Sequence, residues 1–350
     1  MPQDELPHEP LASGRPDDLV VLRPQGLYCP QGDFYIDPWR PVERAVITHA
    51  HADHARPGHA HYLCSRSSAP LLRVRLGDVS LQCLDWGVAL EQRGVRISLH
   101  PAGHVLGSAQ VRIEHRGRVW VASGDYFVSG VGDRNPTCAA FEPLRCHCFI
   151  SESTFGLPVY RWRAMADTFA DINAWWHHNA AAGRPSLLLA YSLGKAQHVL
   201  AGVDVSIGPL FVHGAVDGLN GAYRAAGVAL PAAALLTPGT PRALLARALV
   251  VAPPAVHGGA WARRLGEFGD AFASGWMQLR GARRRQGVDR GFVLSDHADW
   301  PGLMAAIRAT GAERVIVTHG YEEVMVRWLR EQGLQAHAFA TEFGAEPAAA

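Results

Sequence analysis

The chain has 350 residues, of which 48% are hydrophobic, and its formal net charge is only +1. This size suffices for one large or two closely packed domains, and the near-neutral charge excludes a surface that attracts polyanions over its whole extent. No apolar run approaches the roughly 18 to 20 residues that span a membrane. The acidic N-terminus lacks an apolar signal core and the six cysteines form no disulfide framework, so we expect a cytoplasmic protein with reduced thiols.

A stretch of six residues holds three imidazoles and a carboxylate: His49, His51, Asp53 and His54. The apolar run 45–48 comes directly before it, so a strand that ends there would deliver all four side chains into one loop. Neutral imidazole and carboxylate are the ligands that suit zinc and its divalent neighbours. The spacing allows two ions, with His49 and His51 converging on one while Asp53 and His54 turn toward a second.

The rest of the first half is typical of short strands broken by glycine and proline. A strand over 96–99 leads to His104. Two strands over 110–114 and 119–122 flank a polar tip, which predicts a hairpin, and the second leads to Asp125. Each candidate residue thus follows a strand, where loops collect function. The later Cys146-His147-Cys148 stretch is more typical of buried thiols than of a metal clip, because its surroundings are apolar and strand-like.

The pattern changes from about residue 160, where helical stretches alternate with short apolar strands. We expect a helix over 167–182 and strands over 186–190, 210–213 and 248–251. This rhythm predicts a parallel sheet covered by helices.

The C-terminal part returns to candidate site residues. Residues 291–294 lead to His297, and a predicted helix over 301–310 follows. A strand over 314–318 leads to His319. The final helix is expected over 321–332, where apolar residues recur at helical spacing.

Five places therefore present ligands after strands: Asp37, residues 49–54, His104, Asp125 and His319. In this order they resemble the metallo-β-lactamase fold family, and the ordered set is far more specific than any one piece. The alternative is that His104, Asp125 and His319 are structural residues. That interpretation is much weaker for the complete set than for any one of the three.

The resemblance implies a site for two zinc ions, with manganese as another possible metal. The side chains that would hold them are His49, His51 and His104 for the first ion, Asp53, His54 and His319 for the second, and Asp125 as a bridge. Asp37 would lie behind these ligands and support an imidazole or a loop amide. The nucleophile would be a hydroxide between the ions, because metal binding brings the pKa of water from about 15.7 toward about 7.

The second half resembles the β-CASP nucleases within this fold family. The segment between Asp125 and His319 has about the length of their cap domain. Residues 151–156 resemble the acidic motif of that group, with Glu152 as the carboxylate. Residues 295–299 resemble a second motif, with His297 as the imidazole, and His319 belongs to a third. Stretches 101–108 and 191–197 are also similar to β-CASP sequence.

The resemblance extends from about residue 20 to 343 and implies an α/β fold. We expect a metallo-β-lactamase αββα sandwich formed by residues 15–160 and 291–345. A β-CASP α/β cap domain, residues 161–290, would be inserted between these two parts. Residues 1–14 and 346–350 are expected to be disordered.

Residues 275–277 and 289–301 are similar to bacterial DNA-ligase-associated exonucleases, which implies a zinc-dependent exonuclease that hydrolyses DNA in repair, beside a ligase and a helicase. The candidate catalytic residues are Asp125, His297, Glu152 and Asp37. His297 would stabilise charge or give a proton to the leaving oxygen, and Glu152 would orient His297 or a water. The structural alternatives are a packed histidine and an acid that caps a turn.

Other functions stay open at this point. The nearest alternative is a ribonuclease that processes RNA 3′ ends. A small-molecule metallo-hydrolase is a second alternative, although such a substrate needs no cap. A third is an inactive nucleic-acid-binding scaffold, which the complete ligand set argues against.

A local basic patch supports a nucleic-acid substrate in a chain of near-neutral charge. Residues 280–290 carry five arginines, which form either a solvated face or a groove wall that grips phosphates. Lys195 follows Gly194 at an expected helix start, where the helix dipole favours an anion, although it is equally well explained as an ordinary exposed lysine. The candidate nucleic-acid contacts are Lys195, Arg280, Arg283, Arg284 and Arg285.

Overall fold

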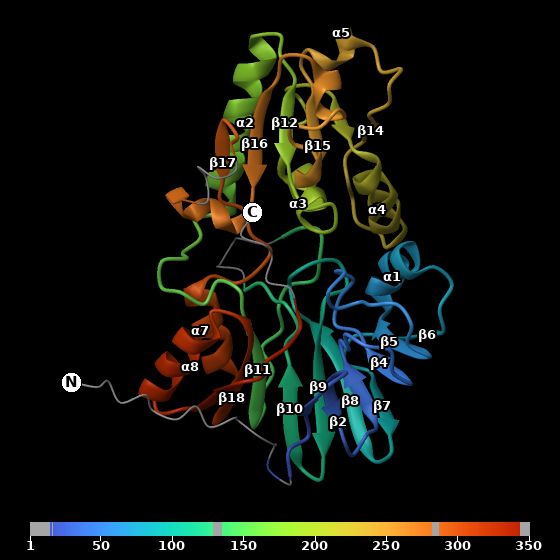
Figure 1. Ribbon diagram of the computed structural model, residues 1–350, viewed down its shortest axis with the longest axis vertical. Helices are drawn as coiled ribbons and strands as arrows, with labels where there is room; N and C mark the ends of the chain where they lie inside the picture. The colour runs from blue at the N-terminus through green and yellow to red at the C-terminus, as the bar shows by residue number, and fades with distance from the viewer. Residues whose placement is uncertain (1–14, 16, 129–134, 282–286, 344–350) are drawn as a thin grey trace, which may run out of the picture.

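The protein is an α/β protein whose described residues form three sheets, two of them mixed and one parallel (Figure 1). The computed structural model describes residues 15, 17–128, 135–281 and 287–343. The terminal segments 1–14 and 346–350, which the sequence predicts to be disordered, lie outside these residues. Among the described helices, none combines the length and the apolar character needed to cross a membrane.

The first sheet has six strands whose order in space follows the chain. The strands are β1 (Val21–Arg23), β2 (Gly26–Cys29), β3 (Phe34–Ile36), β4 (Arg44–Val46), β5 (His61–Ser65) and β6 (Leu81–Leu84). β1 to β3 pair antiparallel, and β3 to β6 pair parallel. The strand predicted over 45–48 ends at Val46, so the loop that carries His49 begins slightly earlier than expected.

The second sheet has seven strands in the order β19-β18-β11-β10-β9-β8-β7. They are β7 (Ala89–Gln92), β8 (Val95–Pro101), β9 (Ala109–His115), β10 (Arg118–Ala122), β11 (Cys148–Ser153), β18 (Arg314–Gly320) and β19 (Gln335–Ala338). The predicted hairpin is confirmed, because β9 and β10 pair antiparallel around the tip. Strands from before and after the long insertion meet where β11 pairs with β18.

These two sheets pack face to face, and helices cover their outer faces. Buried residues of both sheets, such as Leu27, Val46, Val111 and Ile316, share one core between them. The outer face of the second sheet is covered by α7 (Trp300–Thr310) and α8 (Glu322–Glu331). The first sheet packs against α1 (Ala69–Leu76). We call this unit the two-sheet lobe.

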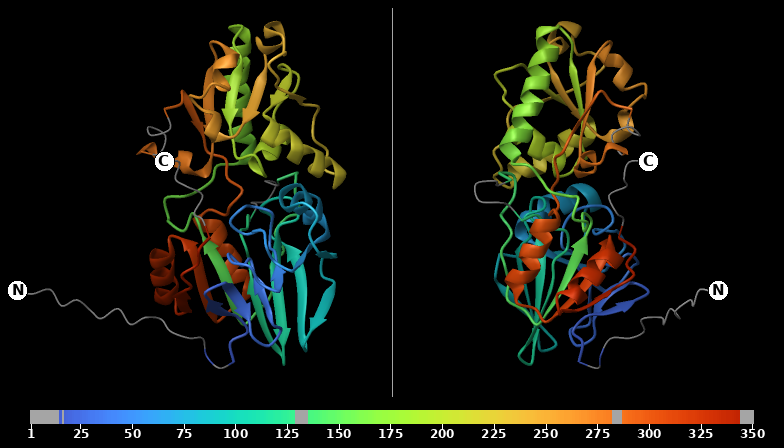
Figure 2. Two further views of the ribbon diagram at one scale, coloured as in Figure 1. Left: turned by 45° about the vertical axis from the view of Figure 1, so that its right-hand side comes forward. Right: turned by 90° about the vertical axis from the view of Figure 1, so that its left-hand side faces the viewer.

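The third sheet forms a separate lobe, seen above the other two sheets in both views of Figure 2. Its strands, all parallel, lie in the order β14-β13-β15-β12-β16-β17. They are β12 (Ser186–Leu189), β13 (Leu210–Val212), β14 (Ala234–Leu235), β15 (Leu249–Ala252), β16 (Gly269–Ala273) and β17 (Arg290–Phe292). The prediction of a parallel sheet with helices is confirmed here. We call this unit the parallel-sheet lobe.

Within the described part of this lobe, four helices accompany the third sheet: α2 (Met165–Ala181), α3 (Lys195–Gly202), α4 (Gly214–Ala225) and α5 (Arg242–Leu245). α2 and α3 share a buried core with one face of the sheet. Short 3₁₀ turns occupy Arg66–Ser68, Pro254–Val256, Ala262–Leu265 and Gly275–Gln278. The domain boundaries at residues 160 and 290 stay a prediction.

The two lobes share an apolar contact beside the site. Leu71 and Leu72 of α1 pack in one buried cluster with Leu219 and Tyr223 of α4. The Tyr223 hydroxyl also accepts a hydrogen bond from the backbone N–H of Leu106, at 3.4 Å. This contact places the loops after β4 and β8 directly below the parallel-sheet lobe.

The cysteines behave as the sequence predicts. Cys146 and Cys148 are free thiols, and both are buried. Burial raises the pKa of the Cys146 thiol to about 12, so it stays protonated at neutral pH. A protonated buried thiol is a poor metal ligand, which supports the structural interpretation of this stretch.

Candidate metal centre and interlobe cleft

The first group of candidate ligands lies in the loops that follow β4, β8 and β10. The Nε2 atoms of His49 and His104 each lie 3.1 Å from His51 Nδ1. Asp125 Oδ2 lies 3.4 Å from His49 Nε2. A tetrahedral zinc ion with Zn–N bonds of about 2.0 to 2.1 Å separates its ligand atoms by about 3.3 Å. These four side chains therefore have the spacing of ligands around one ion.

The second group shares Asp125 with the first. His54 Nε2 lies 3.5 Å from Asp125 Oδ2, and His319 Nε2 lies 3.1 Å from Asp125 Oδ1. Asp53 Oδ2 is 3.8 Å from His54 Nε2 and belongs to a partly exposed side chain. The structure thus brings all of the sequence-predicted ligands together around the Asp125 carboxylate.

The polar atoms at the centre support a pair of cations there. His54 is 1% exposed, and its Nε2 atom makes no hydrogen bond to any residue that the structure describes. A buried polar atom without a partner costs free energy, and a cation bound by its lone pair removes that cost. Imidazole and carboxylate groups suit zinc and also manganese, so these residues fit two divalent ions.

Asp37 and Thr48 set the orientation of two imidazoles from behind. Asp37 accepts hydrogen bonds from His54 Nδ1 and from the Thr48 backbone N–H, both at 2.7 Å. The Thr48 hydroxyl donates to Asp37 and accepts from His49 Nδ1 at 3.0 Å. Both rings therefore carry their proton on Nδ1 and present the Nε2 lone pair to the centre. Asp37 has φ 43°, a left-handed conformation that most residues rarely adopt but that aspartate and asparagine tolerate.

The other two imidazoles are oriented by the parallel-sheet lobe and its connection. His51 Nε2 donates to the backbone carbonyl of Leu193 at 3.2 Å, which leaves Nδ1 to face the first group. His104 Nδ1 donates to the backbone carbonyl of Asp296 at 2.8 Å, which leaves Nε2 to face the first group. The ligand geometry of the first group therefore depends on contacts between the lobes.

The electrostatics favour an ionised Asp125 beside neutral imidazoles of His49 and His104. Burial lowers the pKa of His49 and of His104 well below the usual value. Burial also disfavours charge on His54, but Asp125, Asp53 and the hydrogen bond to Asp37 raise its pKa to about 10. Burial opposes ionisation of Asp125 as well, yet the imidazoles of His54 and His49 hold the pKa of Asp125 well below its usual range. The negative potential concentrated on Asp125 attracts cations.

Glu152 and His297 form a buried pair next to the ligands. His297 Nδ1 lies 2.8 Å from Glu152 Oε2, and Glu152 Oε1 accepts from the Tyr126 backbone N–H at 2.7 Å. His297 lies against the ring of His104, with centroids 4.4 Å apart, and shares one cluster of ligand atoms with Asp125. The nearby Asp299 instead caps the start of α7.

A cleft of about 630 Å³ opens between the lobes above the ligands. His51, Asp53, Asp125 and His297 reach its wall, which is otherwise mostly apolar. The other lining residues include Val74, Arg75, Tyr191, Leu193 and Leu219. Arg75 is the one arginine or lysine among the lining residues, and it also donates to the backbone carbonyl of Ala50. The cleft combines a cation, an aromatic ring and the candidate ligands.

The expected nucleic-acid contacts fall into three cases. Lys195 begins α3 as predicted, but it is buried, with Nζ 3.7 Å from Asp296 Oδ2 and 5.1 Å from the ring centre of Tyr191. In this position its charge meets a carboxylate, not the surface. Arg280 is exposed after the Gly275–Gln278 turn. Arg283, Arg284 and Arg285 lie outside the described residues.

Several residues at the site were not identified from the sequence. Thr48 stands in the apolar run before His49, and Asp296 is adjacent to His297. The neighbouring site residues could therefore have indicated both positions. Leu193 takes part through its backbone carbonyl, which no residue type reveals. Arg75 lies on α1, in a stretch without a motif. These residues follow from tertiary packing.

Sequence comparison relates the chain to larger proteins. It is 33% identical over 317 residues to a probable DNA ligase of Opitutus terrae, a match that covers 89% of this chain and 30% of that protein. It is 30% identical over 124 residues to endoribonuclease YSH1 of Saccharomyces cerevisiae and 30% identical over 125 residues to cleavage and polyadenylation specificity factor subunit 3-I of Arabidopsis thaliana. These two matches cover 35% of this chain and 15% and 17% of the relatives. No family model matches the chain.

Structural comparison shows a shared fold with a crystal structure of a protein of unknown function from Enterococcus faecalis. The TM-score is 0.57 at 11% sequence identity, and the match covers 86% of this chain and 80% of that one. The chain spans less than a third of the length of the curated relatives named above. By sequence, the chain is a homologue of this probable DNA ligase and, over about a third of its length, of the β-CASP metallo-β-lactamase nucleases.

Proposed function

We propose that the protein is a zinc-dependent nuclease that hydrolyses phosphodiester bonds of DNA, acting as an exonuclease in repair. The observation that carries this proposal is the Glu152–His297 pair, whose imidazole lines the cleft beside a ligand set for two ions. The ligands account for hydrolysis, and the pair adds an imidazole beside them that can move a proton.

The finer description of the fold belongs to the same proposal. Two sheets with helices on both outer faces agree with a metallo-β-lactamase αββα sandwich, built from residues 15–160 and 291–345. A parallel sheet drawn from residues 186–292 agrees with a β-CASP cap over 161–290. The cleft lies between these two units.

The chain's own residues would divide the work of phosphodiester cleavage. Two divalent ions would supply an activated water at neutral pH and would offset negative charge on the phosphoryl oxygens. The ligands around Asp125 would hold these ions. Glu152 holds the Nδ1 proton of His297 and fixes the ring, so that Nε2 can donate a proton to the leaving oxygen. Arg75 would bind a phosphate at the mouth of the cleft.

One experiment tests the reaction and the substrate together. Purified protein is incubated with end-labelled DNA and RNA of both polarities, with zinc or with manganese, and His51→Ala serves as the control. We expect stepwise shortening of DNA by the wild-type protein and none by His51→Ala, which lacks a ligand. Cleavage by metal-free His51→Ala would refute the two-metal mechanism, and intact DNA in every wild-type reaction would refute the nuclease.

A ribonuclease that processes RNA 3′ ends is the second candidate. The relatives named endoribonuclease YSH1 support it, since they match over a third of this chain. The same assay separates the two candidates, because preferential cleavage of RNA over DNA of the same sequence would favour the ribonuclease.

A role beside a DNA ligase and a helicase is part of the leading proposal. The match to a longer protein named probable DNA ligase supports the ligase partner. We expect the tagged chain to co-purify with a ligase from its own host. The complex should persist at salt concentrations up to about 0.15 M. Recovery of the chain without either partner would count against it.

A further inference from the structure

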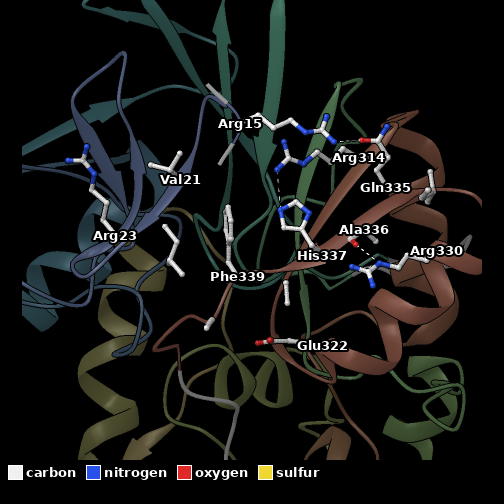
Figure 3. A pocket seen from close by; sticks show the side chains of 14 residues that line it. Arg15, Val21, Arg23, Arg314, Glu322, Arg330, Gln335, Ala336, His337 and Phe339 are labelled. Carbon is white, nitrogen blue, oxygen red and sulfur yellow. Dashed lines mark hydrogen bonds between the residues drawn. The ribbon is translucent and has the colours of Figure 1, made fainter. Parts of the chain in front are cut away.

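A second hollow lies away from the ligands, between the outermost strands of the two packed sheets (Figure 3). It is a groove of about 980 Å³, bordered on one side by β1 and on the other by β19. The described residues that line it include none of the candidate metal ligands. The groove is therefore distinct from the interlobe cleft.

The groove follows the edge of a strand and not its face. Every residue from 334 to 340 lines it, whereas the face of a strand would contribute only alternate residues. The backbone N–H groups of Gln335 and Phe339 donate to Glu313 and Val317 on the inner side. By alternation, the backbone groups of Ala336 and Ala338 point outward. Arg330 Nε donates to the carbonyl of Ala336 at 2.7 Å, which agrees with that direction.

This edge is unpaired within the part of the chain that the structure describes. β19 is the last strand of its sheet, and its one strand neighbour is β18. An open strand edge offers backbone donors and acceptors at the spacing of a further strand. Proteins commonly bind extended peptides in this way, with the main chain giving affinity and pockets for alternate side chains giving specificity.

The charge of the groove identifies the chemistry of its occupant. Its lining holds four arginines and one carboxylate: Arg15, Arg23, Arg314, Arg330 and Glu322. Arg314 is engaged by Asp18, with contacts of 2.5 and 3.0 Å. Figure 3 shows Arg15 beside Arg314, above His337 and the ring of Phe339. The wall thus offers positive charge next to apolar surface.

We propose that this groove binds an extended acidic peptide of a partner protein, which adds as a strand to the outer edge of β19. The outward N–H groups of Ala336 and Ala338 and the carbonyl of Ala338 would pair with the peptide main chain, whereas the carbonyl of Ala336 already accepts from Arg330. Acidic side chains would meet Arg15 and Arg330, and alternate apolar ones would pack on Val21 and Phe339. A DNA strand fits less well, because its sugar-phosphate backbone has no donors to satisfy the carbonyls of a strand edge.

The test uses the full chain and a fluorescent peptide of about eight residues that alternates glutamate and valine. Anisotropy should show saturable binding that weakens as salt is added, since part of the attraction is electrostatic. Ala338→Pro removes one outward N–H without touching the bonds to β18, and we expect about tenfold weaker binding. Ala338→Ser keeps that N–H and should bind like the wild type.

A second pair of variants tests the charge. Arg15→Gln should weaken binding about threefold to tenfold, because one charge-assisted contact is lost. Arg327→Gln is the matched control, since Arg327 is exposed on α8 and does not line the groove. If Ala338→Pro does not fold, as judged by thermal melting, this pair decides the question.

Three results would overturn the proposal. The wild-type chain fails to bind the peptide; or Ala338→Pro, when folded, binds it as tightly as the wild type; or a single-stranded oligonucleotide of equal charge binds better and displaces it. The last result would make the groove a nucleic-acid surface. Cleavage activity is not a readout here, so failure of this proposal is independent of the proposed nuclease function.

Discussion

Asp37→Asn isolates the contribution of a carboxylate that supports the ligands without being one. The side chain accepts from His54 Nδ1 and from the Thr48 N–H, both at 2.7 Å. Asparagine keeps one acceptor oxygen and tolerates the left-handed φ of 43°, so the loop should survive. Its amide nitrogen, however, cannot accept the His54 proton. The ring would then favour a proton on Nε2, which blocks the lone pair that faces the centre.

The loss of such a supporting group costs about 10- to 100-fold in metal affinity, which is about 1.4 to 2.7 kcal/mol. Competition with a chelator, followed by metal analysis of the protein, measures this change. Asp33→Asn is the matched control, since Asp33 also has a positive φ and accepts from Tyr28 and Arg44 on the surface side. Equal metal affinity in Asp37→Asn and the wild type would refute the argument that Asp37 sets the tautomer of His54.

Three other perturbations test separate parts of the site and the fold. His297→Ala should keep its metal while cleavage slows by about 10²- to 10⁴-fold, and metal loss or a normal rate would contradict the assigned role. Arg75→Gln should raise KM and should reduce the slope of log binding constant against log salt concentration by about one unit. Arg73 is exposed on the same helix, and Arg73→Gln should change neither quantity. Burial lowers the pKa of His59 to about 4, so the unfolded state binds its proton first as pH falls below about 6.5. The free energy of unfolding should therefore drop between about pH 6.5 and 4, by no more than about 3 kcal/mol, and His59→Gln should remove that part of the slope in urea titrations; an identical slope would count against it.

The sequence predicts which candidate ligands lie together because each follows a strand or shares one short loop. His49, His51 and His54 share one loop, and each of His104, Asp125 and His319 stands at or near a strand end, where it must reach the same rim of the two packed sheets. Spacing and order therefore suffice to predict that these side chains meet.

Contacts that depend on the packing of the lobes could not be predicted in the same way. The carbonyl of Leu193 lies 142 residues from His51, and that of Asp296 lies 192 residues from His104. Lys195 shows the same limit: its place at a helix start follows from the sequence, but its burial follows from Asp296 across the lobe boundary. Side-chain type indicates chemistry, whereas exposure depends on the assembled fold.

The two carbonyls that orient His51 and His104 make ion binding and lobe closure thermodynamically linked. Each of these two hydrogen bonds forms when the lobes are closed and favours the imidazole tautomer that binds a cation. Closure of the lobes therefore raises the affinity for metal. Linkage is reciprocal, and bound cations must therefore favour the closed arrangement by the same free energy. The metal-free protein should open its cleft more often than the loaded one. Hydrogen exchange of the Leu193 and Asp296 segments would report this as faster exchange after chelation.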